Sequence, residues 1–258
     1  MFWWRYRRRR AGSHPRLPAH ELRDEEMQIV THVAGHEASA RGQPILVEHL
    51  LLALVQSESV AGAIRTAGGD TEAVEDRVSA ALDAAPRSSA PVLVLSEAAA
   101  IALSMTAGMA AHHGRPATCA DLWFALMRPP HGGELVAAAG VDPTAVLFVL
   151  AHGVAESELA APATEPRELP ASPGQGAIDD VELVLVNDDF SPQELVVRVL
   201  RDELGLRDDE ATRLMLKTHH EGRASLGRYP GAHARKVVAA IIALARRRGY
   251  PLWIRLLP

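Results

Sequence analysis

Cysteine is almost absent from this chain, whose 258 residues include one, Cys119. A single cysteine excludes an intramolecular disulfide framework and a metal site built from several thiolates, and it is typical of a reducing compartment. Long apolar runs are also missing: none approaches the roughly 18 residues of a membrane span, and the first residues lack the apolar core of a signal peptide. The sequence therefore predicts a cytoplasmic protein with no membrane partner.

Aromatic side chains are scarce as well, and negative charge exceeds positive charge. Aromatic residues make up 4% of the chain and apolar residues 48%, which predicts cores of Ala, Leu and Val. The net charge of −5 does not favour nucleic acid as a partner. Arginines are nevertheless concentrated at the start, where residues 1–20 are predicted to form a basic flexible arm. The alternative is that Arg, Trp and Tyr of this arm bind nucleic acid or an anionic membrane.

The phosphate-binding sequence Gly-x-x-x-x-Gly-Lys-Ser/Thr does not occur anywhere in the chain. In NTPases of the usual type, the backbone of that loop holds the phosphates of the nucleotide. We therefore expect no nucleotide hydrolysis of that type, and no nucleotide cofactor.

A segment rich in proline and glycine divides the chain. Between Glu156 and Gly176 these residues recur among Ala, Ser and Glu, and no apolar period is sustained. Such a composition is typical of a linker, which we place at residues 154–179. Two compact domains are therefore predicted, at residues 21–153 and 180–258.

The two domains are predicted to differ in fold class, as α plus α+β. Residues 21–153 are rich in alanine and show helical patterning. The second domain opens with alternating Val181, Leu183 and Leu185, which is typical of a strand. We expect an all-α domain followed by a small three-stranded sheet covered by three helices.

The first domain contains an internal repeat, which becomes visible when the sequence is shifted along itself without a gap. One shift places Gly42-Gln43-Pro44 on Gly114-Arg115-Pro116. The same shift places Ala67-Gly68-Gly69-Asp70 on Ala139-Gly140-Val141-Asp142. We call this shift the repeat offset. In each copy we expect one helix to end at the first glycine, a short apolar helix after the proline, and a third helix opening at the aspartate. Two four-helix copies packed about a pseudo-twofold axis would bury both apolar faces.

The second domain carries a polar motif at a strand-to-helix turn. Asn187-Asp188-Asp189-Phe190-Ser191-Pro192 follows the first strand, and Thr218-His219-His220-Glu221-Gly222 ends a predicted helix. Ser191 is predicted to be the N-cap of the intervening helix, with Glu194 completing a capping box. Two carboxylates, an amide and an imidazole around one pocket would suit an ammonium ion better than a bond to be broken.

Several features of the first domain support a family resemblance. The run His49-Leu50-Leu51-Leu52-Ala53-Leu54, in a duplicated helical unit that ends at Ala151-His152-Gly153, resembles the amino-terminal domain of Clp unfoldases such as ClpA and ClpC. The resemblance covers about residues 22–153. It implies an eight-helix docking module for adaptors and substrates that carries no catalysis.

The second domain resembles the ClpS adaptor family over residues 180–258. The resemblance rests on Val186 to Pro192, on Ala211-Thr212 and Met215-Leu216, and on further positions in the same order and spacing: His219, Gly222, Gly227, Pro251 and Leu252. That family binds N-degrons, which are proteins whose first residue is Leu, Phe, Tyr or Trp. It delivers them to a Clp unfoldase with its peptidase.

The resemblance implies a role for each matching residue. Asn187, Asp188 and His219 would bind the substrate's α-amino group and first peptide unit. The first side chain would lie in a hydrophobic pocket lined by Asp189, Ser191, Gln193, Val196, Met215, Thr218 and Leu252. Gln193 and Thr218 replace a methionine and a valine that are usual in the family, which makes the mouth and the wall of the pocket more polar.

Docking on the unfoldase is less clearly encoded. Lys236 matches a docking lysine of the family when a one-residue gap is placed before it. This chain joins an adaptor-like domain to a domain of the kind on which adaptors dock. One hypothesis is that the two domains bind each other in cis. The other is that the first domain tethers the protein to an unfoldase ring or to a second copy of the protein. A rival interpretation is a pseudo-adaptor or scaffold that binds and regulates the unfoldase without delivering substrates.

Two simpler interpretations and one catalytic interpretation compete with the ligand site. Asn-Asp-Asp can be a plain turn, and His219 a partly buried helix residue. A catalytic site would use His219 as base with Asp188 or Asp189, and His220 as an added metal ligand. Adjacent histidines on a helix point about 100° apart and do not form the i, i+4 pair of helical zinc sites. We therefore predict no catalytic residue, metal ion or cofactor.

Overall fold

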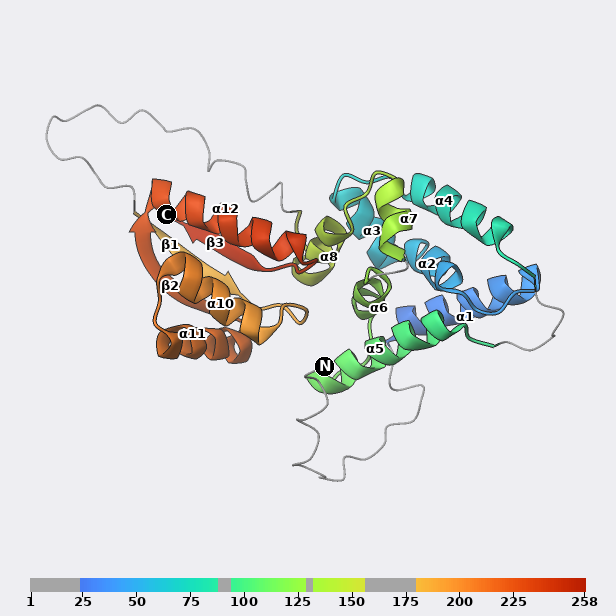
Figure 1. The fold of residues 1–258 in the computed structure, drawn as a ribbon, viewed down its shortest axis with the longest axis horizontal. Coiled ribbons are helices and arrows are strands. Elements are labelled where there is room, and N and C mark those ends of the chain that lie inside the picture. The colour runs from blue at the N-terminus through green and yellow to red at the C-terminus, as the bar shows by residue number, and fades with distance from the viewer. Residues whose placement is uncertain (1–23, 88–93, 129–131, 156–179) are drawn as a thin grey trace, which may run out of the picture.

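The computed structural model describes residues 24–87, 94–128, 132–155 and 180–258. The residues up to 155 are helical and are called the helical part, and those from 180 onward are called the sheet part (Figure 1). The expected arm at residues 1–20 and most of the expected linker at 154–179 lie outside the described residues. The helices of the helical part are α1 Glu25–Arg41, α2 Val47–Val55, α3 Glu58–Thr66, α4 Thr71–Ala84, α5 Glu97–His113, α6 Cys119–Leu126, α7 Gly132–Ala138 and α8 Pro143–His152.

The predicted repeat is confirmed by the helix boundaries. Helix α5 begins and ends at the repeat offset from α1, and α6 and α8 begin at the same offset from α2 and α4. The two copies exchange equivalent hydrogen bonds. Asp24 N donates to Ala117 O at 3.0 Å, and Ser96 N, the repeat counterpart of Asp24, donates to Ile45 O at 2.9 Å. This reciprocal pairing is what two copies related by a pseudo-twofold axis produce.

Caps end and begin these helices where the sequence places them. Gly42 and Gly114 adopt the left-handed conformation with φ of 61° and 64°, which glycine reaches without a steric penalty. Asp70 and Asp142 accept hydrogen bonds from the amides two residues later, at 3.0 and 2.8 Å. The helix that follows each aspartate is the fourth of its copy and not the third, because α3 and α7 precede it.

One buried position has the same function in both copies. His49 Nδ1 accepts a hydrogen bond from Leu46 N at 3.1 Å, and Asp121, the repeat counterpart of His49, accepts one from Thr118 N at 2.9 Å. Both side chains are fully buried. Since Nδ1 accepts, the neutral His49 ring carries its proton on Nε2, and burial lowers its pKa. Each side chain closes the first turn of its central helix.

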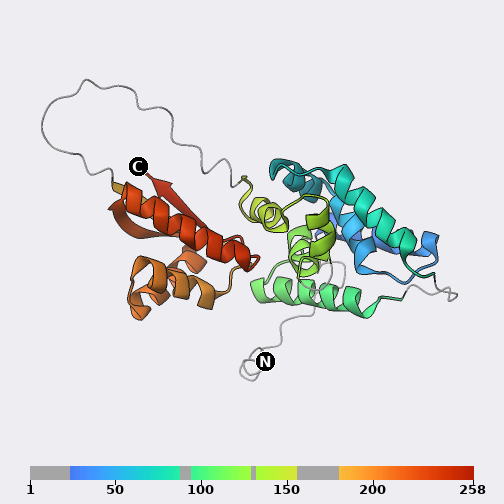
Figure 2. The ribbon, with the colours of Figure 1, turned by 45° about the horizontal axis from the view of Figure 1, so that its top comes forward.

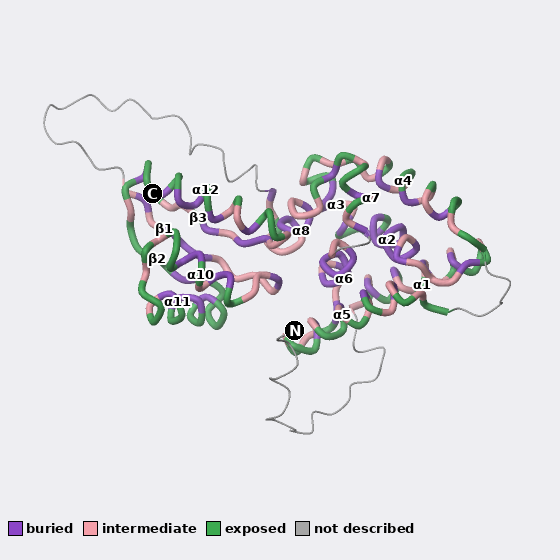
Figure 3. The backbone as a smooth tube through the Cα atoms, in the orientation of Figure 1, coloured by how far each residue is buried: buried purple, intermediate pink, exposed green. Residues whose placement is uncertain are grey.

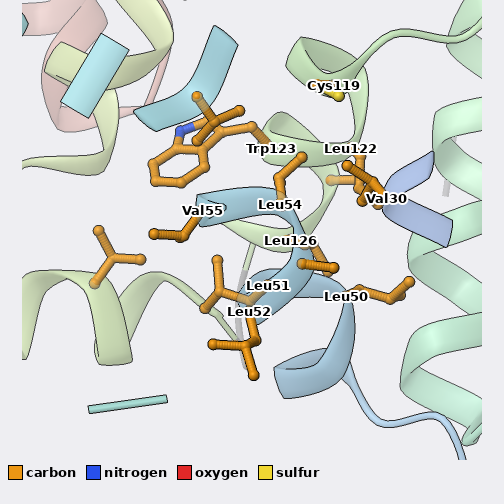
Figure 4. Packing of buried hydrophobic residues seen from close by; sticks show 14 of the residues in the cluster. Val30, Leu50, Leu51, Leu52, Leu54, Val55, Cys119, Leu122, Trp123 and Leu126 are labelled. Carbon is orange, nitrogen blue, oxygen red and sulfur yellow. The ribbon is translucent and has the colours of Figure 1, made fainter. Parts of the chain in front are cut away.

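The core of the helical part lies around α2 and α6 (Figure 3). Leucines of α2 interdigitate with Leu122, Trp123 and Leu126 of α6 (Figure 4), and Trp123 Nε1 donates to Pro143 O at 3.0 Å. Cys119 is 2% exposed, and burial raises its thiol pKa to about 12. This cysteine is therefore a core residue and not an activated nucleophile.

The sheet part consists of β1 Asp180–Val186, α10 Gln193–Leu204, α11 Asp208–Glu221, β2 Arg223–Pro230, α12 Gly231–Arg247 and β3 Trp253–Leu257. Strand β1 is central in an antiparallel sheet of order β2-β1-β3. Val181, Leu183 and Leu185 alternate along β1 and pack with the three helices in a second hydrophobic cluster. The α+β class predicted for this part is confirmed.

The two parts lie side by side (Figures 1 and 2). Phe190 of the sheet part belongs to the hydrophobic cluster of the helical part and is 8% exposed.

No single helix in the described ranges is long and apolar enough to cross a membrane. Two bent helix pairs, α2 with α3 and α7 with α8, reach the length and apolar composition of a membrane span only when the two helices of a pair are counted together.

Candidate functional site

The turn after β1 is organised by the carboxylate of Asp188. Its Oδ1 accepts hydrogen bonds from Phe190 N at 2.8 Å and from Ser191 N at 2.6 Å. Asn187 N donates to Gly222 O at 2.9 Å, which ties the turn to the end of α11. The motif at residues 187–192 and the helix end at residues 218–222 therefore come together as the sequence predicts.

The capping box predicted at Ser191 is absent. Helix α10 begins at Gln193, and its N-cap is Pro192, which has no side-chain hydrogen bond to offer. Ser191 Oγ is buried and has no hydrogen-bond partner among the described residues. Asp188 bonds the two amides just before the helix, and the serine hydroxyl does not bond the amides of the first helical turn.

A small pocket opens at this turn. Nine of the ten side chains predicted for the α-amino site and the hydrophobic pocket line it, and its volume is about 30 Å³. The lining residues are Leu185, Val186, Asn187, Asp188, Ser191, Gln193, Val196, Met215, Thr218, His219 and Leu252. Leu185 and Val186 were not predicted, although they end the strand that carries the motif. We call this cavity the first pocket.

The two polar replacements have different consequences in the first pocket. Thr218 is buried, and its hydroxyl donates to Leu214 O at 2.9 Å within α11. Its hydrogen is therefore already used, which reduces the polarity that Thr218 adds to the wall. Gln193 is exposed at the first turn of α10 and remains available at the mouth.

Electrostatics single out Asp188 within the first pocket. Burial raises the pKa of its carboxyl, while the amide hydrogen bonds of Ser191 and Phe190 and the nearby His152 lower it. Burial lowers the pKa of His152, whose Nε2 donates to Pro251 O at 2.7 Å. A half-buried carboxylate without a full positive partner gains from a cation that brings its own hydrogen-bond donors.

Asp189 does not line the first pocket, so its predicted place must be corrected. Its Oδ2 accepts from Arg115 Nε at 3.1 Å and from Arg115 Nη2 at 3.0 Å. His113 Nε2 donates to the Asp189 carbonyl at 3.1 Å. Asp188 folds back onto its own turn, and the next side chain is consequently directed to the helical part.

Arg115 connects Asp189 to the core of the helical part. It also donates to Asp121 at 2.6 and 2.9 Å, and that carboxylate is fully buried. These hydrogen bonds, those to Asp121 first, raise the pKa of the guanidinium. Sequence reasoning missed Arg115, because 74 residues separate it from Asp189 and only its place after Gly114 in the repeat marked it.

A second contact between the two parts is aromatic. The Phe124 ring lies 5.3 Å from that of Phe190 and 6.2 Å from that of Tyr250. Arg128 lies 4.0 Å above Phe124 and 4.6 Å above Tyr250, and it donates to Gly249 O at 3.1 Å. The sequence offered no signal for these partners.

A second cavity, of about 220 Å³, lies between the two parts. It is lined by Arg115, Thr118, Ala120, Leu150, Ala151, Asn187, Asp188, Asp189 and Phe190. Asn187 and Asp188 line both this cavity and the first pocket. We call it the interpart cavity.

The remaining predicted residues lie apart from both cavities. Lys236 is exposed on α12 and lines neither of them. His220 is exposed beside His219 at the end of α11, with ring centroids 5.5 Å apart, and it does not line the first pocket as His219 does. Within the described residues, no group of three His, Cys, Asp or Glu side chains is placed to hold a metal ion.

Comparison with known proteins adds two family matches. Residues 178–255 match the model of the ATP-dependent Clp protease adaptor protein ClpS, and residues 24–117 match the Clp repeat amino-terminal domain. The first match contains every residue of the first pocket. The second ends at the loop before α6, although the structure continues the repeat through α8.

Two curated ClpS adaptor proteins are similar to part of this chain. The adapter protein ClpS of Leptothrix cholodnii is 46% identical over 71 residues, which is 28% of this chain and 62% of that protein. ClpS of Nitrosomonas eutropha is 39% identical over 71 residues, or 28% of this chain and 69% of that protein. The chain thus matches about two thirds of the length of these relatives.

Two solved structures are also similar. Agrobacterium tumefaciens ClpS2 bound to L-phenylalaninamide is 26% identical, with a TM-score of 0.31, over 32% of this chain and 99% of that one. The Hsp104 amino-terminal domain of Candida albicans is 14% identical, with a TM-score of 0.47, over 50% of this chain and 88% of that one. From the family matches and the identity to curated relatives, the chain belongs to the ClpS adaptor family and joins a Clp repeat amino-terminal domain to its ClpS domain.

Proposed function

We propose that this protein is an adaptor of an ATP-dependent Clp protease. It binds N-degron substrates through their free α-amino group and large apolar first residue and delivers them to an unfoldase of the ClpA or ClpC type. The observation that carries this proposal is the first pocket, where Asn187, Asp188 and His219 share one opening with the apolar residues Val196, Met215 and Leu252.

The chemistry of the first pocket suits a polypeptide amino terminus. An α-amino group with a pKa of about 7.7–8.0 is largely cationic at neutral pH. Its three N–H donors can bond the carboxylate of Asp188 and the acceptors of Asn187 and His219. An acetylated terminus would leave the charge of Asp188 without a cation. The unpaired hydroxyl of Ser191 is a further polar group that a bound backbone can satisfy.

The size of the first pocket constrains how a first residue binds. The first pocket is narrow, with a free space of about 30 Å³, and we expect the side chains of its lining to adjust when a Leu or Phe side chain enters. Met215 and Gln193 are unbranched and can change rotamer at small cost. Burial of the large apolar side chain then contributes roughly 1.5–3 kcal/mol, which separates Leu or Phe from Ala.

Asp188→Asn is the sharpest test of this site. The asparagine oxygen can still accept from Phe190 N and Ser191 N, so the turn is kept while the charge is removed. Fluorescence anisotropy should show that the unmodified chain binds a Leu- or Phe-initiated peptide and not its acetylated twin. Asp188→Asn should weaken binding by about tenfold or more, the usual worth of a charge-assisted hydrogen bond.

The matched control is Asp209→Asn, which changes an exposed aspartate on α11 away from the pocket. It should bind like the unmodified chain. Equal affinity of the free and acetylated peptides, or full affinity of Asp188→Asn, would contradict the assigned role of the pocket.

A second candidate function is that of a pseudo-adaptor or scaffold that regulates the unfoldase without delivering substrates. The small pocket and the exposed Gln193 at its mouth favour it. Degradation of a Leu-initiated reporter by a Clp unfoldase and its peptidase separates the two functions. A delivering adaptor accelerates loss of the reporter, whereas a pseudo-adaptor leaves it unchanged or slows it.

The organisation of the chain is part of the proposal. It comprises a basic arm at 1–20, a Clp amino-terminal domain at 21–153, a linker at 154–179 and an adaptor domain at 180–258, in a cytoplasmic protein. The contacts of Arg115 with Asp189 and of Phe124 with Phe190 support docking of the two domains in cis. Lys236, which these contacts leave exposed, is then available to an unfoldase.

A further inference from the structure

The helical part contacts the sheet part at two segments that are far apart in the sequence, and each segment adjoins a wall of the first pocket. The first segment is the turn after β1, where His113 Nε2 donates to the Asp189 carbonyl at 3.1 Å. Phe190, the next residue, is buried in the hydrophobic cluster of the helical part. Asp188 and Ser191, which flank these two residues, line the first pocket. One wall of the pocket is thus held from the helical part.

The second segment connects α12 to β3. Arg128 Nη2 donates to the carbonyl of Gly249 at 3.1 Å. His152 Nε2 donates to that of Pro251 at 2.7 Å, and Figures 1 and 2 show α8, which ends at this histidine, beside the connection. Leu252, the next residue, lines the first pocket. A second wall is therefore held from the helical part as well.

The first pocket lies between these two segments and the helices α10 and α11, which supply Val196, Met215 and Thr218. Its free space is about 30 Å³, and we expect its walls to adjust when a large side chain enters. Met215 can adjust by changing its rotamer. A shift of the backbone next to Leu252 would instead strain or break hydrogen bonds to the helical part, which costs free energy. Contact between the two parts therefore opposes wide opening of the pocket.

We propose that contact with the helical part restrains the first pocket and lowers its affinity for substrates, most strongly for those with the largest first side chain. Binding of such a substrate loosens the contact in return, because coupling between two equilibria is reciprocal. Arg128 and His152 are positioning residues, since neither lines the pocket and both act through the segment before Leu252. This inference rests on the proposed function, because it needs a first residue in the first pocket.

The test compares the full chain with its variant Arg128→Ala with His152→Ala, which frees the segment before Leu252 and keeps every lining residue of the first pocket. Anisotropy with Leu-, Phe- and Trp-initiated peptides should show tighter binding by the variant. The gain should be about fivefold or more for Phe and Trp and smaller for Leu. The matched control is His36→Ala with Arg65→Ala, the same residue types exposed on α1 and α3, and it should bind like the unmodified chain.

The outcomes distinguish this inference from the proposed function. Equal or weaker binding of all three peptides by the variant, with binding by the unmodified chain, would overturn the restraint and leave the proposed function standing. Binding of none of the peptides by either chain would overturn the proposed function, and the restraint with it.

Amide hydrogen exchange of the unmodified chain measures the reciprocal effect without any variant. Helix α8 contacts the sheet part through Phe148 and His152, whose rings lie 5.8 and 5.0 Å from that of Trp253. A saturating Phe-initiated peptide should loosen this contact and speed exchange in α8, whereas its acetylated twin should leave exchange unchanged. Unchanged or slower exchange in α8 with the free peptide bound would contradict the inference.

Discussion

At the scale of single residues, two adjacent aspartates have different functions because of the bonds each one makes. Asp188 is bonded by backbone amides of its own turn, and Asp189 by a guanidinium from the helical part. The first keeps a carboxylate that a ligand cation can approach at the pocket. The second holds the two parts together.

The pKa of Asp188 predicts how peptide binding depends on pH. Burial raises this pKa above 3.8, so the carboxylate is lost on acidification earlier than that of an ordinary aspartate. The affinity for a Leu-initiated peptide should therefore fall on the acidic side as Asp188 is protonated. On the alkaline side it should fall near about pH 8 as the peptide amine loses its proton. Anisotropy titrations across the pH range measure both limbs.

Asp188→Asn supplies the control for this profile. It should remove the acidic limb that belongs to Asp188 and keep the alkaline limb, while His152 and His219 remain in place.

The stability of the ligand-free fold should depend on the protonation of Asp188 in the opposite direction to peptide binding. Because the folded chain holds the Asp188 proton more tightly than the unfolded chain, this group favours folding at low pH and loses that contribution as pH rises. At neutral pH, Asp188→Asn should consequently raise the melting temperature of the ligand-free chain, and a lowered one would contradict the assignment.

At the scale of secondary-structure elements, the repeat places equivalent residues of the two copies against each other. A Cβ built on Gly69 would lie 2.8 Å from Val141 Cγ2 and 3.2 Å from Ile64 O. Val141 is the repeat counterpart of Gly69. One copy needs a glycine here because the other has a valine.

Gly69→Ala should therefore destabilise the helical part by about 1–3 kcal/mol, the usual cost of overpacking. In a Val141→Ala background the closest contact disappears, so the same change should cost less. Urea unfolding of the two single variants and the double variant gives this coupling.

Gly108→Ala is the matched control on α5. A Cβ there meets nothing within 4 Å, and an alanine in a helix is better than a glycine. It should stabilise the chain by about 0.4–1 kcal/mol. Additive effects of Gly69→Ala and Val141→Ala would show that the two copies do not meet at this point.

At the scale of the whole molecule, the two parts are held by an ion pair, a cation–π pair and packed aromatic rings. The ion pair joins Arg115 to Asp189, and the cation–π pair joins Arg128 to Tyr250. Phe190 is buried in the cluster of the part to which it does not belong in sequence. These contacts also enclose the interpart cavity.

The variant Arg128→Ala with Asp189→Ala should weaken the contact between the two parts, while the packing of Phe190 and the hydrogen bond of His152 to Pro251 O remain. It removes the hydrogen bonds of Arg128 to Arg248 O and Gly249 O together with the Arg115 ion pair. In molecules whose two parts come apart, the linker predicted at residues 154–179, taken as a coil of about 25 residues, allows an average separation of about 25–30 Å. Small-angle X-ray scattering should record a radius of gyration larger by several ångströms.

The control pair is Asp209→Ala with Arg213→Ala, the same residue types exposed on α11. Its scattering curve should match that of the unmodified chain. If the curve of the interface variant also matched it, the interface would not depend on these charges.

Much of this molecule follows from local sequence. The internal repeat, the glycine and aspartate caps and the alternating strand at Val181 depend on neighbours within a short stretch of chain, so the pattern predicts them. Nine residues of the first pocket were predicted from the resemblance to the ClpS family, and one turn and one helix end carry most of them.

Only the tertiary structure decided the remainder. A sequence pattern predicted Ser191 as the cap of α10, but the helix begins after Pro192, and Asp188 closes the turn before it by accepting from Ser191 N at 2.6 Å. The direction of Asp189 depends on Arg115, 74 residues away, and that of Tyr250 on Arg128, which belongs to the other part of the molecule. Local pattern determines which groups gather at the turn, whereas the direction in which each group points depends on partners that only the folded chain brings into contact.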